Sequence, residues 1–312
     1  MGRVSCFQTM LASDRQVVHK LIFSHGNYVA LEEVLNDAIE KGAEKYIFTG
    51  DLINEFPFGN KVINLIKELK KNFDVYVVKG NREQYLIEYD EYKYTWENVQ
   101  FKNTVFMRNE LTDDNFEFIK ELPFSLSIKI EDLKIKLFHG SIYNISQFIH
   151  NYDDSLMEEI SNELDEDIFI FGHSHQRIWT RDAFGKKFIN AGCSGVSKVN
   201  PKHAEYLIMN IDGKNIDIEE RNIEYNTDFL KEEILKSGIL NVDNVFVNFA
   251  YLAVTGGGDL TREFFKRATE EMNKKNASMV KEDAKGVYKK FRLIDDDIWF
   301  MLAKEYSKYF RL

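Results

Sequence analysis

The sequence contains little cysteine, little proline and no long apolar run. Its two cysteines, Cys6 and Cys193, are too few for a disulfide framework, and they lack the CxxC spacing of thiolate zinc sites. No run approaches the roughly 18 consecutive apolar residues of a membrane span, and the N-terminus lacks the apolar core of a signal peptide. We therefore expect a cytoplasmic protein with no membrane partner, in which any metal is held by His, Asp and Asn.

Positive charge is also in the minority. The 41 Lys and Arg residues against 51 Asp and Glu residues give a net charge of −10, which repels a polyanion unless basic groups are concentrated in one place. Duplex nucleic acid is therefore not expected as a ligand. The rest of the composition, 44% hydrophobic and 29% charged, is typical of a globular protein with a sizeable core.

Because the chain has three prolines, its division into regions rests on changes of pattern. Residues 1–19 show no clear period and are interpreted as a divergent N-terminal leader. Residues 20–222 alternate short apolar runs with helical patterns, such as the one over 31–42 that ends at Gly42, and this alternation predicts a layered α/β domain. Residues 223–312 carry charged amphipathic patterns and predict a helical C-terminal extension. Its apolar side chains must pack on the core or on a second subunit, so a homo-oligomer formed through these helices is a further prediction.

Six apolar runs of the middle region end in glycine mixed with His, Asp or Asn. The polar ends lie at residues 24–27, 49–51, 79–83, 139–141, 172–175 and 190–192. In α/β sheets, ligands gather beyond the carboxyl ends of strands, because loops can converge there on a rigid frame. We therefore expect these six loops to build one site.

The side chains at these strand ends are those that bind transition metals. They include one Asp, one Asn and four of the seven histidines: Asp51, Asn81, His25, His139, His173 and His175. Neutral imidazole, carboxylate and amide oxygen suit Mn²⁺, Fe²⁺, Zn²⁺ or Ni²⁺, whereas oxygen ligands alone would favour Mg²⁺ or Ca²⁺. A carboxylate such as Asp51 can bridge two cations, which can then hold the attacking and leaving oxygens of a phosphoryl displacement.

The order of these motifs resembles that of the calcineurin-like metallophosphoesterases, in particular their small bacterial and archaeal phosphodiesterase branch. The matching motifs are HGN, GD, GN-x-E, HG and GHSH, followed by NAGCSG, over roughly residues 20–210. The resemblance implies a four-layer α-β-β-α sandwich of two mixed sheets flanked by helices. It also implies a centre of two divalent metal ions, Mn²⁺, Fe²⁺, Zn²⁺ or Ni²⁺, where the loops of the sheets meet.

The same resemblance implies which residues hold the ions. Asp51 would bridge them. The other ligands would be His25 and His175 on the first ion, and Asn81, His139 and His173 on the second. A hydroxide bridging the two ions would then attack phosphorus, so no side-chain nucleophile is needed.

The resemblance further implies catalytic roles for Asn81, Arg82 and His139, and substrate contacts from Gly26, Asn27 and Arg82. Many relatives carry a histidine at the position of Arg82, where it protonates the leaving group. Arginine, with a pKa above about 12, cannot do this at neutral pH. The chain is therefore expected to act on esters with good leaving groups.

A second departure from the family pattern concerns the first ion. Relatives have Asp two residues before the histidine of the first motif, whereas this chain has Phe23 two residues before His25. Phenylalanine cannot ligate a metal, so the first ion is expected to bind weakly or to be lost, with impaired activity. Cys193 in the segment NAGCSG is interpreted as a small buried residue in a tight turn, because no histidine near it in sequence could activate the thiol.

Two functions are consistent with these residues. The first is a metal-dependent phosphoesterase that hydrolyses a small phosphodiester or phosphomonoester, nucleotide-derived esters included. The alternative is a catalytically weakened homologue that binds metal and a phosphorylated ligand as a regulatory or interaction module. The missing carboxylate at Phe23 is what separates the two.

Overall fold

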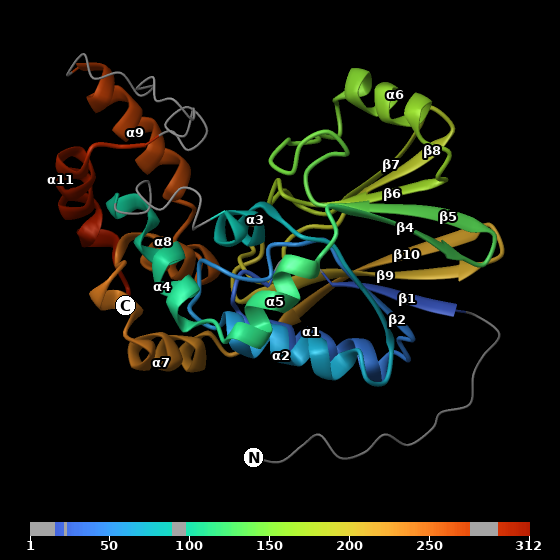
Figure 1. The fold of residues 1–312 in the computed structure, drawn as a ribbon, viewed down its shortest axis with the longest axis horizontal. Helices are drawn as coiled ribbons and strands as arrows, with labels where there is room; N and C mark the ends of the chain where they lie inside the picture. Colours follow the sequence, from blue (N-terminus) through green and yellow to red (C-terminus); the bar gives the residue numbers. More distant parts are fainter. Residues whose placement is uncertain (1–15, 22–23, 89–97, 275–292) are drawn as a thin grey trace.

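The computed structural model describes residues 16–21, 24–88, 98–274 and 293–312 of the chain, and within these ranges two five-stranded mixed sheets form (Figure 1). In spatial order, the first sheet contains β10 (Asn215–Glu224), β9 (His203–Asp212), β1 (Gln16–Leu21), β2 (Lys45–Phe48) and β3 (Asp74–Val77). The second contains β4 (Ser125–Ile130), β5 (Leu133–Phe138), β6 (Ile168–Phe171), β8 (Lys186–Asn190) and β7 (Trp179–Ala183). The mixed α/β class predicted from the sequence is confirmed.

Each sheet has three neighbouring parallel strands. Strands β1, β2 and β3 run parallel to one another, as do β5, β6 and β8, while the remaining strands pair antiparallel. These six strands are the apolar runs whose ends carry the polar motifs, so the loops that follow them leave one edge of each sheet. Strand β1 begins at Gln16, inside the stretch interpreted as a leader. Phe23 lies outside the described residues.

The helices of the described ranges are α1 (Tyr28–Glu40), α2 (Gly59–Leu69), α3 (Asn81–Ile87), α4 (Lys102–Glu110), α5 (Asp113–Glu121), α6 (Asp154–Glu163), α7 (Thr227–Ser237), α8 (Val245–Val254), α9 (Thr261–Lys274) and α11 (Asp296–Tyr306), with short 3₁₀ turns at Val99–Phe101, Ile239–Asn241 and Ser307–Tyr309. The helix expected over 31–42 is α1, and Gly42 follows it in the left-handed region at φ +80°. None of the described helices is both long and apolar enough to cross a membrane.

Three apolar layers join the sheets and helices. Side chains alternate across each strand, so Ile47 of β2 faces the second sheet and packs in one cluster with Ile170 of β6, while Tyr46 points to the opposite face, among residues of α1 and α2. On the outer face of the second sheet, Phe169 packs with Met157 of α6. The two sheets thus face each other, with α1 and α2 on one side and α6 on the other (Figure 1).

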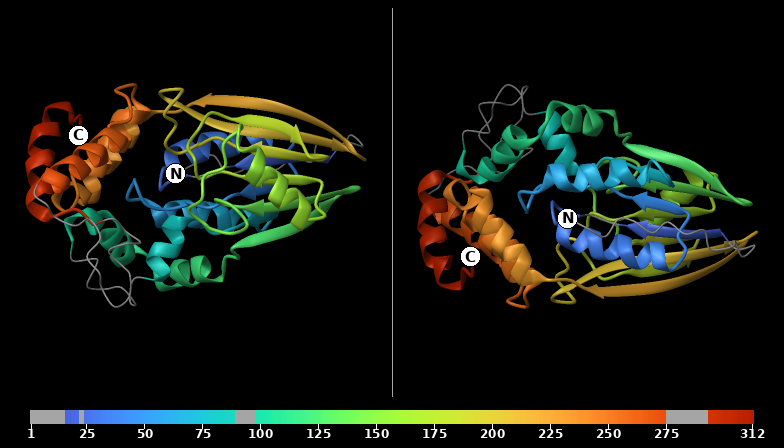
Figure 2. Two further views of the ribbon diagram at one scale, coloured as in Figure 1. Left: turned by 90° about the horizontal axis from the view of Figure 1, so that it is seen from above. Right: turned by 90° about the horizontal axis from the view of Figure 1, so that it is seen from below.

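The described elements that follow β10 are all helical, and they gather at one end of the molecule (Figure 2). Helix α8 was not predicted from the sequence. Nine of its ten residues are buried, so it shows no amphipathic pattern. Phe249 of α8, Phe264 of α9 and Trp299 of α11 share a separate apolar cluster. Phe300 of α11 remains 60% exposed, which leaves apolar surface that a second subunit could cover. A homo-oligomer formed through these helices stays a prediction.

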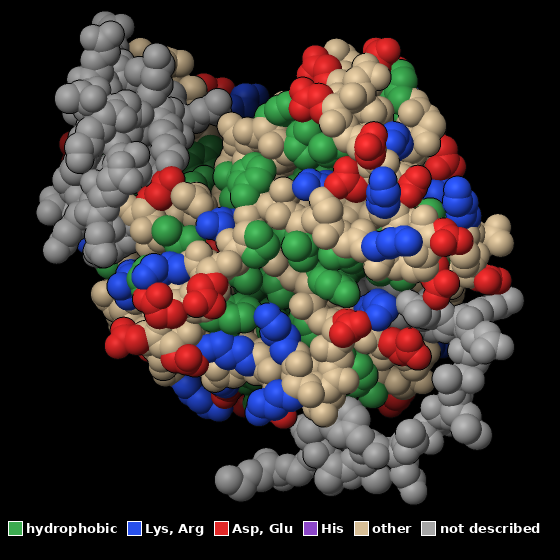
Figure 3. All heavy atoms as spheres, turned by 45° about the vertical axis from the view of Figure 1, so that its right-hand side comes forward, with side chains coloured by type: hydrophobic (Ala, Val, Ile, Leu, Met, Phe, Trp, Pro, Cys, Tyr) green, Lys and Arg blue, Asp and Glu red, His purple; other side chains and the backbone are tan. Residues whose placement is uncertain are grey.

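Charges of both signs are interspersed on the face shown in Figure 3. Several are paired, such as Lys45 with Asp74 at 2.6 Å and Lys187 with Asp182 at 2.6 Å. Such pairs on the surface contribute little stability. The expectation that duplex nucleic acid is not a ligand stays a prediction.

Asp243 caps the buried helix α8 and makes stability depend on pH. Its Oδ1 accepts the backbone N–H groups of Val245 and Phe246 at 3.0 and 3.2 Å. Burial raises the pKa of this carboxyl from 3.8 to about 6. A raised folded-state pKa means that the carboxyl contributes its full stability below pH 4 and loses it as the pH rises to 6 and above.

Asp243→Asn is therefore expected to stabilise the protein at pH 7 and not at pH 4, because asparagine keeps the capping oxygen without the charge. A pKa shift of about two units corresponds to a gain of up to about 3 kcal/mol at pH 7. Urea unfolding at both pH values measures it. Asp228→Asn, at an exposed position in the first turn of α7, is the control and should change the two free energies equally. An equal effect of Asp243→Asn at both pH values would contradict the assignment.

Candidate metal centre

The loops after β2, β3, β5 and β6 bring four of the predicted residues together. Metal-ligating atoms of Asp51, His139 and His173 all lie within 4.8 Å of one another, and Asn81 Oδ1 lies 3.0 Å from His139 Nε2. Asp51 and His173 have left-handed backbones, with φ of 51° and 65°. Residues other than glycine seldom adopt this conformation, and it is concentrated at functional sites.

The imidazole rings of this group are oriented by backbone carbonyls. His139 Nδ1 donates to the carbonyl of Thr49 at 2.8 Å, and His173 Nε2 donates to the carbonyl of Ser146 at 3.0 Å. The remaining nitrogens, His139 Nε2 and His173 Nδ1, lie 3.0 Å apart, and His139 Nε2 is also 3.4 Å from Asp51 Oδ2. Lone pairs this close repel unless a proton or metal cation lies among them. The two imidazoles, carboxylate and amide oxygen fit a divalent transition metal, and carbonyl-held rings are typical of its histidine ligands.

A second group of possible ligands lies beside the first. Ligating atoms of His25, His175 and Cys193 also fall within 4.8 Å of one another, and the two imidazole centroids are 4.5 Å apart. His25 Nδ1 lies 2.7 Å from Glu55 Oε2, which fixes the ring as a second-shell carboxylate does in metal sites. The structure therefore brings His25 and His175 together, as expected, and adds a sulfur atom that was not expected there.

The imidazoles of the two groups differ in protonation state. Burial, then the charge of His139, lowers the pKa of His173 to about 4, and burial lowers that of His175 well below its usual value. Both rings are neutral at pH 7, with lone pairs available to an ion. Burial would also lower the pKa of His25, but Glu55 and Cys193 outweigh it and raise the pKa to about 10. An ion at this ring must therefore displace a proton.

Asp51 remains ionised in spite of its burial. Burial favours the neutral carboxyl, yet the charges of His139, His25 and Arg82 hold the pKa of Asp51 well below its usual range. The backbone N–H of Arg82 donates to Asp51 Oδ1 at 2.9 Å. A buried carboxylate held by one backbone bond and facing imidazoles is suited to bind a cation.

Glu83, at the start of α3, ties the loops after β2 and β3 together. Its carboxylate accepts backbone N–H groups from Gly80, Asp51 and Leu52 at 2.7 to 2.8 Å. Burial, then the charge of Asp51, raises the pKa of Glu83 to about 6. The signal in the sequence was the glutamate three residues after Gly80, whose side chain accepts the backbone N–H of the N-cap residue as in one half of a capping box.

Two of the predicted substrate-binding residues have structural roles in this fold. Asn27 caps α1 through Oδ1, and its Nδ2 donates to the carbonyl of Gly195 at 2.8 Å. A Cβ on Gly26 would lie 2.0 Å from the carbonyl oxygen of Phe56, so this glycine allows two backbone segments to touch. The polar side-chain atoms of Asn27 are thus occupied within the protein and Gly26 packs against backbone, and the substrate contacts expected of these two residues stay a prediction.

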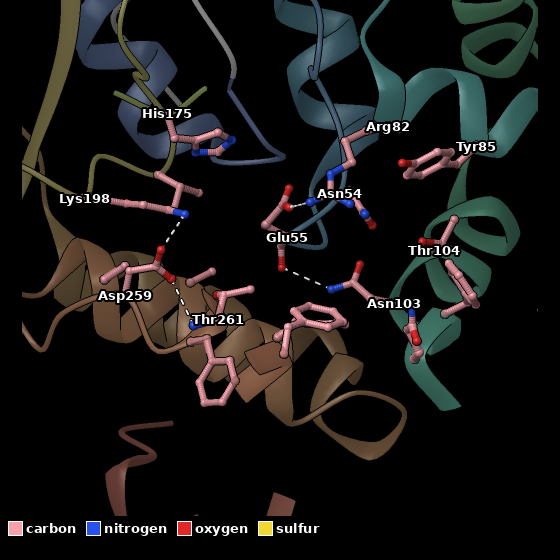
Figure 4. A pocket seen from close by; sticks show the side chains of 18 of the residues that line it. Asn54, Glu55, Arg82, Tyr85, Asn103, Thr104, His175, Lys198, Asp259 and Thr261 are labelled. Carbon is pink, nitrogen blue, oxygen red and sulfur yellow. Dashed lines mark hydrogen bonds and ion pairs between the residues drawn. The ribbon is translucent and has the colours of Figure 1, made fainter. Parts of the chain in front are cut away.

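A cavity of about 390 Å³ opens beside the two groups, between the sheets' loops and the C-terminal helices (Figure 4). Arg82 pairs there with Glu55, a residue that sequence analysis missed because its loop shows no motif. On the opposite side, Lys198 Nζ lies 2.8 Å from Asp259 Oδ2. His175 borders the cavity near Lys198, so a ligand inside it lies next to the possible metal ligands.

Comparison with known proteins is consistent with this geometry. The model of the calcineurin-like phosphoesterase superfamily domain matches residues 21–214. Uncharacterized protein MJ0912 of Methanocaldococcus jannaschii is 24% identical over 233 residues, which cover 68% of this chain and 89% of that protein.

Two crystal structures have a similar fold. Hypothetical protein PH1004 from Pyrococcus horikoshii superposes with a TM-score of 0.65 at 20% identity, covering 75% of this chain and 97% of its own. A metallophosphoesterase from Sphaerobacter thermophilus superposes with a TM-score of 0.59 at 19% identity, covering 77% and 99%. With more than half of its residues matched by the family model, this chain belongs to the calcineurin-like phosphoesterase superfamily.

Proposed function

We propose that this protein is a metal-dependent phosphoesterase that hydrolyses small phosphodiesters or phosphomonoesters, nucleotide-derived esters included. The observation that carries the proposal is the convergence of Asp51, Asn81, His139 and His173 on one point. The adjoining residues Arg82 and His175 line a cavity. When bound, divalent cations such as Mn²⁺ activate water and neutralise the charge of the phosphoryl group. No side-chain nucleophile is then required.

In this proposal the ligands divide between two ions. Asn81, His139 and His173 would hold the second ion, His25 and His175 would hold the first, and the Asp51 carboxylate would be shared by both. Carbonyls and Glu55 fix the rings of His139, His173 and His25, so little rotational freedom is lost when the ions bind. Whether Phe23 impairs activity stays a prediction.

Arg82 is the residue that we expect to contact the phosphate. Its side chain is 32% exposed and reaches the cavity, where it pairs with Glu55. A guanidinium can hold two phosphate oxygens at once, but it cannot protonate a leaving group at neutral pH. The proposed substrates are therefore esters whose leaving groups depart without help from an acid.

The cavity also indicates what else the substrate carries. Its positively charged side chains, Arg82 and Lys198, are each paired with a carboxylate that also lines the cavity. They therefore add little net positive charge to attract an anion. Phe246 and Phe249 of α8 and Phe265 of α9 line another part of it. Such a wall favours an apolar or aromatic group attached to the phosphate.

Removal and return of metal tests the proposal directly. Treatment with a chelator is expected to reduce hydrolysis of bis-p-nitrophenyl phosphate to the uncatalysed background, and added Mn²⁺ to restore it. Elemental analysis of the same samples reports the number of ions per chain. Bound metal without turnover in Mn²⁺, Fe²⁺, Zn²⁺ or Ni²⁺ would instead support the alternative, a module that binds metal and a phosphorylated ligand.

A further inference from the structure

In the family pattern an aspartate is a ligand of the first ion. This chain has Phe23 at that position, so one anionic ligand is missing. His25 and His175, with no anionic ligand besides the shared Asp51, would hold a divalent cation weakly. The structure places Cys193 beside them, with its sulfur and one nitrogen of each ring mutually within 4.8 Å. These three residues come from loops after β1, β6 and β8, so only the folded chain brings them together.

The surroundings of Cys193 differ from those of a cysteine that merely fills space. Its side chain is buried, with 1% exposure, and it contacts apolar residues of the main core. Its sulfur also accepts the backbone N–H of Val196 at 3.4 Å, a bond that helps to fix the position of the sulfur. The side of Cys193 toward His25 and His175 is thus lined by groups that bind cations.

We propose that Cys193 is a metal ligand, and that its thiolate replaces the missing aspartate at the first ion. This proposal rests on the metal centre of the proposed function. One anionic sulfur then takes the place of one anionic oxygen, so the charge of the ligand set is unchanged. Binding releases the thiol proton and the proton held by His25 to solvent and forms a sulfur–metal bond. Because thiolate is a soft ligand, this position selects Zn²⁺ over Mn²⁺.

The proposal goes beyond the interpretation of Cys193 as a small buried residue in a turn, whose burial the structure confirms. That interpretation depended on the lack of a histidine near it in sequence. Cys193 is 168 residues after His25 and 18 after His175 in the sequence, but the fold brings the three side chains together. Glu55 orients His25 through its contact with Nδ1, as carboxylates that bond the other ring nitrogen orient histidine ligands of metals.

Cobalt spectroscopy of the full-length, metal-free protein tests the assignment without relying on activity. Titration with Co²⁺ is expected to produce the near-ultraviolet charge-transfer band of a cobalt–thiolate bond. Cys193→Ser should lose this band and bind one ion at least about 10-fold more weakly. Cys6→Ser, which removes the other cysteine of the chain, should keep both the band and the affinity. Circular dichroism checks that each variant is folded.

X-ray absorption of the zinc-loaded parent gives a second readout that needs no variant. A sulfur neighbour at about 2.3 Å from zinc is expected. Bound cobalt or zinc with nitrogen and oxygen neighbours alone would overturn the proposal, as would a charge-transfer band that persists in Cys193→Ser. If the protein hydrolyses esters but its metal has no sulfur neighbour, the thiolate ligand is wrong and the proposed function stands. If the metal has a sulfur neighbour but no ester is hydrolysed, the thiolate ligand stands and the proposed function is wrong.

Discussion

Asp51→Asn is expected to lower kcat/KM for bis-p-nitrophenyl phosphate by about 10³-fold, equivalent to about 4 kcal/mol of transition-state stabilisation. Asparagine has the same shape and can still accept the backbone N–H of Arg82, which reaches Asp51 Oδ1 at 2.9 Å. The variant loses the negative charge that faces His139. Steady-state kinetics in Mn²⁺ and elemental analysis of the purified variant measure the effect.

The control for this variant is Asp217→Asn, which neutralises an exposed aspartate on β10. It changes the net charge equally but should leave the rate and metal content at parental values. If Asp51→Asn kept all its metal and came within tenfold of the parental rate, Asp51 would not be a ligand, and the proposed division of residues between two ions would be wrong.

Gly80→Ala is expected to lower kcat/KM by about 10²-fold and the free energy of unfolding by about 1 to 3 kcal/mol. A Cβ at this position would lie 2.2 Å from Asp51 Oδ1 and 2.4 Å from Asp51 N. Gly80 has φ −101°, which alanine adopts without strain, so the whole effect comes from the collision. Relief of that collision displaces the Asp51 carboxylate from the imidazoles. Kinetics and urea unfolding of the same preparation measure both losses.

Gly213→Ala separates this collision from the general cost of replacing glycine. Gly213 lies between β9 and β10 at φ +58°, and an added Cβ meets no atom within 4 Å. Alanine there should cost about 1 kcal/mol of stability through backbone strain and leave the activity unchanged. Parental activity in Gly80→Ala would show that the Asp51 loop can move without loss of function.

The motifs at the strand ends could be predicted because each begins where an apolar run in the sequence gives way to polar residues. Strands β2 and β6 are almost completely buried, so each appears as a short apolar run, and the polar residue that follows stands out against it. This is why Asp51 and His173 could be identified. The gathering of their loops follows from the parallel direction of the strands.

The remaining features depended on contacts that no local pattern encodes. Glu55 lies in a loop with no motif, and its role becomes visible only when His25 Nδ1 is found 2.7 Å away. Cys193 likewise acquires its neighbours through folding. For Gly26 and Asn27, the motif alone does not reveal whether a residue faces a cavity or the protein interior, and their contacts within the chain became visible only in the fold.

The cavity walls that come from α8 and α9 lie beyond the part of the chain that matches the family model, which ends at residue 214. The groups that would perform the chemistry all precede that point. In the proposed function, part of the surface that selects the substrate is therefore encoded in a different stretch of the gene from the groups that perform the reaction. Relatives that keep the same catalytic loops but carry a different C-terminal segment are expected to cleave different esters.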